Sequence, residues 1–118
     1  MQYLLLCCFD ETRWNAIPAA ERDSIMGAYG EFVRRQIAGG RYVTGGKLDD
    51  SSAAVTLRQR DGGPSITDGP FAETKEQLGG YHVVECENRE EALAIAGQIP
   101  TLPHGGTIEV RPLLYALV

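Results

Sequence analysis

The chain has 118 residues, of which 43% are hydrophobic, and carries a formal net charge of −5 at pH 7. This length and composition predict a single domain over residues 1–118 with one modest hydrophobic core. The net negative charge and the absence of any run of Lys or Arg argue against partners such as nucleic acid or an anionic membrane surface.

The chain contains three cysteines, Cys7, Cys8 and Cys86, an odd number without disulfide density or metal-ligand spacing. They predict a reducing, cytoplasmic location in which the thiols act as small buried hydrophobic groups. The apolar run at residues 3–9 follows no positively charged segment and is too short to span a membrane. It therefore predicts neither a signal peptide nor a membrane anchor.

The first two predicted elements are a strand and a helix. Residues 2–9 are apolar at odd and even positions, which predicts a strand covered on both faces. Asp10 follows the strand and could project into a cleft or lie in a solvated loop. Helical spacing covers residues 18–38, with Trp14 just before it, at the edge of the core or of a pocket. The stripe expected to face the core consists of Ile25, Tyr29, Phe32, Val33 and Ile37.

The middle of the chain predicts a strand and a hairpin. Residues 41–48 predict a strand interrupted by Gly45-Gly46, which indicates a bulge or a close approach of two backbones. Residues 54–60 and 64–67 predict two further strands. The Asp61-Gly62 pair between them favours a tight hairpin turn.

This hairpin leads to a corner at Asp68-Gly69-Pro70. The Asp68 side chain can accept hydrogen bonds from amides that follow it, Gly69 tolerates a positive φ, and Pro70 fixes its own φ. We expect a rigid turn that holds Phe71 in the core. The charged residues 73–76 then either line a pocket or form a solvated segment.

The last third of the chain predicts a strand, a helix and a strand. Residues 81–87 form the strand, and Asn88 is the expected N-cap of a helix that runs to Pro100. The final strand is predicted over residues 107–117, at a sheet edge or a bulge because of Pro112. This order places both long helices on one face of the sheet. The other apolar face needs a partner, and we expect a homodimer.

The run DGPFAETKEQLGGYHVVE, which starts at Asp68, resembles the signature of the DGPF branch of the YCII-related family, and the resemblance covers nearly the whole chain. It implies an α+β, ferredoxin-like βαββαβ fold with an extra β-hairpin, forming a dimeric α/β barrel. Characterised relatives resemble small cofactor-free enzymes with a proposed His–Asp active site, and one branch removes chloride from a chlorinated hydroxyquinol. DGPF proteins are often encoded beside extracytoplasmic-function sigma factors.

Few residues are candidates for chemistry, because nucleotide-binding, hydrolase and metal motifs are missing and neither cofactor nor metal is expected. Tyr29 occupies the position where many DGPF relatives carry a histidine, and a phenol with a pKa near 10 is a poor base. The candidate catalytic residues are therefore Asp10 or Asp68 as base and Tyr29 as hydrogen-bond donor. Candidate ligand contacts are the charged or ring-bearing residues Glu73, Lys75, Tyr81, His82 and Arg111.

Tyr81 and His82 are neighbours in a predicted strand, so their side chains point to opposite faces. His82 can accordingly be a packed, hydrogen-bonded residue as well as a ligand contact. Two functions stay open. One is the binding or transformation of a small organic molecule, without a cofactor, in a pocket near the Asp68 corner. The other is a non-catalytic dimeric accessory module linked to an extracytoplasmic-function sigma factor. A cavity containing Asp10, Tyr29 and Asp68 would favour the first.

Overall fold

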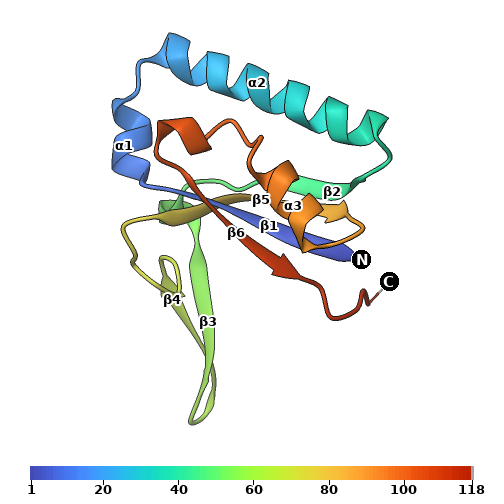
Figure 1. Cartoon of the computed structure of the whole chain (residues 1–118). Helices are drawn as coiled ribbons and strands as arrows, with labels where there is room; N and C mark the ends of the chain where they lie inside the picture. The colour runs from blue at the N-terminus through green and yellow to red at the C-terminus, as the bar shows by residue number, and fades with distance from the viewer. Residues whose placement is uncertain (118) are drawn as a thin grey trace.

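The computed structural model describes residues 1–117 and shows an α+β architecture (Figure 1). Its main sheet is antiparallel and has the strand order β2-β5-β1-β6, which is compatible with the predicted ferredoxin-like fold. A separate two-stranded sheet, β3-β4, confirms the extra hairpin. The strands are β1 (Gln2–Phe9), β2 (Tyr42–Lys47), β3 (Val55–Arg60), β4 (Gly63–Asp68), β5 (Gln77–Glu85) and β6 (Thr107–Pro112).

The helices α2 and α3 pack on one face of the main sheet, and α2 runs above it in the view of Figure 1. Asn88 is the N-cap of α3, as predicted, because its Oδ1 accepts a hydrogen bond of 2.9 Å from the Glu91 amide. A short helix follows β1 and begins directly after Asp10 in the chain. The sequence pattern did not predict it. The helices are α1 (Glu11–Ala16), α2 (Ala19–Ala38) and α3 (Arg89–Ala96), with single 3-10 turns at η1 (Ser51–Ala53) and η2 (Leu102–His104).

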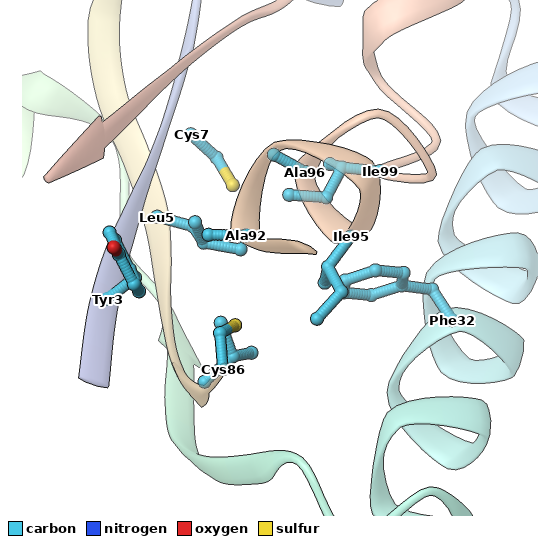
Figure 2. Close-up of a cluster of buried hydrophobic side chains, with 10 residues drawn as sticks. Tyr3, Leu5, Cys7, Phe32, Cys86, Ala92, Ile95, Ala96 and Ile99 are labelled. Atoms are coloured by element: carbon cyan, nitrogen blue, oxygen red, sulfur yellow. The ribbon is translucent and has the colours of Figure 1, made fainter. Parts of the chain in front are cut away.

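The hydrophobic core fills the space between the sheet and the two long helices (Figure 2). Leu5 of β1 and Phe32 of α2 are both 0% exposed, and α3 packs between them through Ala92 and Ile95. Strand alternation explains the choice of residues, because every second side chain of β1 points toward the helices. The side chains that β1 places in this core are Tyr3, Leu5 and Cys7.

The opposite face of the sheet is apolar and has no helix over it (Figure 1). We call it the open face; β1 and β5 contribute Leu4, Leu6, Cys8, Tyr81 and Val83 to it. Leu4 pairs with Val83 and Leu6 pairs with Tyr81 across the two strands, so these side chains are direct neighbours. All five residues are only half-buried. The prediction that the helices leave one apolar face uncovered is therefore confirmed.

The boundaries and contacts of several predicted elements need correction. The last strand ends at Pro112, so residues 113–117 are not part of it. Strand β5 begins at Gln77 rather than at residue 81, because Gln77, Leu78 and Gly80 already pair with β1. In α2, Ile37 is 59% exposed, and Gln36 is buried in its place. The Gln36 side chain reaches Gln98 after α3, which satisfies its amide.

The corner after β4 has the predicted backbone but not the predicted packing. Gly69 has a φ of +99°, which favours glycine, and its amide donates a 2.7 Å hydrogen bond to the Ala54 carbonyl. Phe71, however, is 80% exposed, and the guanidinium of Arg58 lies over its ring, 5.5 Å from the ring centroid. The prediction that the corner holds Phe71 in the core is wrong, because the hairpin carries the corner away from the helix-covered face.

Among residues 1–117, no helix combines the length and the apolar composition needed to cross a membrane.

Candidate functional site

A cavity of about 350 Å³ lies where the ends of β1, β2 and β5 meet α1 and α2. This volume lies within the range of small-molecule sites. The Trp14 ring, from α1, meets Phe9 edge to face with ring centroids 5.6 Å apart. Most of the wall is apolar, as such sites usually are. The larger apolar side chains in it are Phe9, Trp14, Met26, Val33, Leu48 and Leu78.

The polar part of the wall is centred on His82 of β5, which is only 6% exposed. Its Nδ1 lies 2.8 Å from the hydroxyl oxygen of Tyr42 on β2, within hydrogen-bonding distance. Burial lowers the pKa of His82 below 6.5, so the imidazole is neutral at pH 7. A neutral imidazole has one nitrogen that accepts and one that donates a hydrogen bond.

Tyr29 of α2 stacks on His82, with ring centroids 5.6 Å apart and an angle of 25° between the rings. Its hydroxyl donates a hydrogen bond of 3.2 Å to the sulfur of Cys7. Burial is the main cause that raises the pKa of Tyr29 and that of the Cys7 thiol. Both groups are therefore neutral at pH 7. Tyr29 can donate a hydrogen bond, as predicted, and the thiol is not a thiolate nucleophile.

Gly45 makes the contact between Tyr42 and His82 possible. A Cβ atom at Gly45 would lie 2.9 Å from Nδ1 of His82 and 2.8 Å from the carbonyl oxygen of Tyr81, and it would overlap the Tyr42 hydroxyl. These distances are shorter than carbon contacts in folded proteins. The first glycine of the Gly45-Gly46 pair therefore leaves the space that the Tyr42 hydroxyl occupies, which confirms the predicted close approach at this point.

The rim of the cavity is polar and mostly acidic. Glu11 accepts hydrogen bonds from the Ser51 amide, at 2.9 Å, and from the Ser51 hydroxyl, which fastens α1 to η1. Lys47, Asp49 and Asp50 complete the charged part of the rim. Deeper in the wall, the buried hydroxyl of Thr101 has no hydrogen-bond partner among residues 1–117. Such a hydroxyl is available to a bound molecule or to water.

The structure brings only two of the predicted site residues, Tyr29 and His82, to the cavity wall. Tyr81 lies on the open face of β5, which confirms that it and His82 point to opposite sides. Asp10 does not line the cavity, and its carboxylate instead accepts hydrogen bonds from the amides of Thr12 and Arg13, at 3.0 and 3.3 Å. It serves as the N-cap of α1.

The remaining predicted residues lie away from the cavity wall. Asp68 is exposed at the end of β4, and Glu73 and Lys75 are exposed in the loop that follows. Arg111 forms an ion pair with Glu109 on β6, at 2.6 Å. The cavity contacts the second half of the signature run, residues 77–80, rather than the Asp68 corner. The structure thus separates Asp68 from Tyr29, with which it was expected to share a cavity.

Sequence reasoning missed Tyr42, Cys7 and Thr101 as parts of the site. The spacing between Tyr42 and Gly45 was the one available signal, since a glycine pair in a strand indicates that something approaches closely. Residues 1–117 contain no group of three or more His, Cys, Asp or Glu side chains that could hold a metal ion.

We predict that Gly45→Ala displaces the Tyr42 hydroxyl from His82, because the added methyl group would overlap it. The expected result is a changed His82 imidazole resonance in NMR spectra and a loss of stability of about 1–3 kcal/mol. Gly79→Ala is the matched control, since its Cβ would meet only the Cys7 carbonyl oxygen, at 3.9 Å. Unchanged His82 resonances in Gly45→Ala would contradict the role of this glycine.

We predict that stability falls as the pH drops below about 6.5. The folded-state pKa of His82 is lower than its unfolded value, so the unfolded chain binds the proton more readily in this range. The free energy of unfolding should be fully present above pH 6.5 and decrease toward the folded-state pKa. His82→Gln should flatten this part of a urea-denaturation series. An equal slope in wild type and His82→Gln would contradict the assignment.

Two comparisons with known proteins place the chain in a family. The model of the YCII-related domain matches residues 1–115. An uncharacterized protein of Rhizobium meliloti (strain 1021) is 37% identical over 114 residues, which cover 96% of this chain and 92% of that protein. The residues matched by the family model therefore extend over β1 to β6 and include every residue that lines the cavity. This chain belongs to the YCII-related family.

Proposed function

We propose that this protein binds a small, largely apolar organic molecule in the cavity between β1, β2, β5 and the first two helices, without a cofactor. The observation that supports this function best is the pair of Tyr42 and a neutral, buried His82 in the wall of an apolar cavity of about 350 Å³. In an apolar pocket, a few buried polar groups fix the orientation of the bound molecule.

The side chains in the cavity wall indicate which class of ligand would fit. Trp14, Phe9 and Tyr29 offer aromatic surfaces, which favour a planar ring. The hydrogen-bonding groups, namely His82, Tyr42 and the buried hydroxyl of Thr101, suit a ligand that carries one or two hydroxyl groups. The mostly acidic rim disfavours an anion. A neutral hydroxylated aromatic molecule combines these properties.

The same groups could transfer a proton if the bound molecule reacts. His82 is neutral and therefore able to accept a proton at pH 7, and Tyr42 holds the imidazole through its hydrogen bond. This arrangement replaces the base that the sequence suggested at Asp10 or Asp68. The three cysteines are all unpaired thiols, which supports a reducing compartment such as the cytoplasm as the place of action.

We predict saturable binding of p-cresol, measured through the fluorescence of Trp14, the only tryptophan in the chain. Toluene, the same ring without the hydroxyl, should bind about tenfold more weakly, because it leaves the buried polar groups unpaired. Tyr42→Phe should remove much of this difference. Val33→Phe should fill the cavity and abolish binding, whereas Ile37→Phe, on the exposed side of α2, should not.

Two results would count against a ligand site. Absence of saturable binding across a panel of phenols, alicyclic alcohols and small carboxylic acids would be the first. Binding to Val33→Phe that equals binding to the wild type would be the second. A stable dimer that binds none of these molecules would favour the non-catalytic interaction module instead.

We also propose that the protein is a homodimer that pairs through the open face of its sheet. This face presents the apolar residues Leu4, Leu6 and Val83 to solvent, although the sheet's other face is covered by helices. Apolar surface of this kind marks an interaction site. A face that pairs with itself forms the two-fold symmetric dimer that is commonest among oligomers.

We predict that light scattering at micromolar protein gives twice the chain mass of 12.8 kDa. Leu6→Asp should reduce the mass to that of one chain, because a charge would then lie in the apolar interface. Leu93→Asp, on the exposed side of α3, should leave the dimer intact. A wild-type mass of 12.8 kDa at every micromolar concentration would exclude this dimer.

A further inference from the structure

The β3–β4 hairpin, which we call the arm, is an amphipathic ribbon. Leu57 and Ile66 lie opposite each other on one face, and Val55 is two residues from Leu57 on the same face. These three side chains are 65%, 72% and 65% exposed, respectively. The other face is polar, since it carries Thr56, Arg58, Ser65 and Thr67. The arm thus has a defined apolar face that nothing in residues 1–117 covers.

The arm stands apart from the rest of the molecule. In Figure 1 it extends away from the main sheet on the side opposite to α2 and α3. The Cα radius of gyration is 16.1 Å, against about 13.5 Å for a compact domain of this length. A two-stranded hairpin without a packing partner is marginally stable in water. The arm therefore needs another surface to cover its apolar face.

The size of the open face indicates what that surface is. Four strands spaced about 4.8 Å apart and six to nine residues long give a footprint on the order of 400–500 Å². A stable interface buries about 800 Å² on each partner. The apolar face of the arm adds about 200 Å² by the same measure. The open face and the arm together approach what a stable dimer needs, whereas the open face alone does not.

We propose that the apolar face of the arm docks on a second copy of this chain and is part of the same interface as the open face. This inference rests on the proposed homodimer. The arm and the open face lie on the same side of the chain, so a partner that covers one is adjacent to the other (Figure 1). Val55, Leu57 and Ile66 carry no charge, and the one charged residue on this face is Asp68, which pairs with Val55 at the end of the arm away from its turn. A single carboxylate at one end of the surface is not a charge pattern that would select a charged foreign partner, and the apolar part of the surface matches the apolar character of the open face.

The test changes the apolar face of the arm and measures the dimer dissociation constant by sedimentation equilibrium. Leu57→Asp and Ile66→Asp should each weaken the dimer at least tenfold, because each places a charge in the contact. Thr67→Asp is the matched control, since Thr67 adjoins Ile66 on the polar face, and it should change the constant less than about threefold. Circular dichroism should show unchanged secondary structure in all three variants, because each site lies outside the core.

Hydrogen exchange gives a second, independent measurement. The amides of the arm should exchange at least tenfold more slowly in the wild-type dimer than in the Leu6→Asp monomer. Equal exchange in the two proteins, or a dimer that Leu57→Asp and Ile66→Asp leave unchanged, would overturn the proposal while the open-face dimer remained. A wild-type protein that is monomeric at all concentrations would overturn both and leave the arm face to a different protein.

Discussion

The structure depends on one constraint: the main sheet has two apolar faces, and its helices cover only one of them. Strand β1 is apolar on both faces, but α2 and α3 cover only one of them. Leu5 is consequently 0% exposed, whereas its neighbour Leu6 points to the open face. Full burial of such a side chain is worth about 1.5–3 kcal/mol. The apolar side chains of the open face are not yet buried, so covering them with a partner would still stabilise the protein. The same holds for the apolar face of the arm.

Much of the fold could be predicted, because its elements follow local rules. A run that is apolar at odd and even positions identified β1, the Asn88 cap marked the start of α3, and the Asp61-Gly62 turn marked the hairpin. Helix α1 was missed because its six residues are too few for a helical period to show. The packing of Phe71 was missed for a different reason. Where a hairpin points is decided by its connection to the sheet, and residue types within the hairpin carry no information about it.

The site was harder to predict, because it depends on a register shift. Alternation alone would put Tyr42 and Gly45 on opposite faces of β2. An irregularity between Tyr42 and Thr44 inserts a residue, so that Tyr42 pairs with Val84 while Gly45 pairs with His82. Both therefore face the helices, where the Tyr42 hydroxyl reaches the imidazole. The glycine pair signalled a bulge, but not which side chain the bulge would turn inward.

The same register shift decides which base the proposed function can use. A general base must lie within reach of the bound molecule, whereas Asp68 is exposed at the end of β4 and the carboxylate of Asp10 caps α1 outside the cavity wall. His82 starts from a pKa of 6.5, and burial needs only to keep it neutral. Tyr29 cannot serve instead, since its pKa is raised and its proton is held toward Cys7. His82, for which the sequence left a purely structural role open, is therefore the group best suited to accept a proton in this cavity.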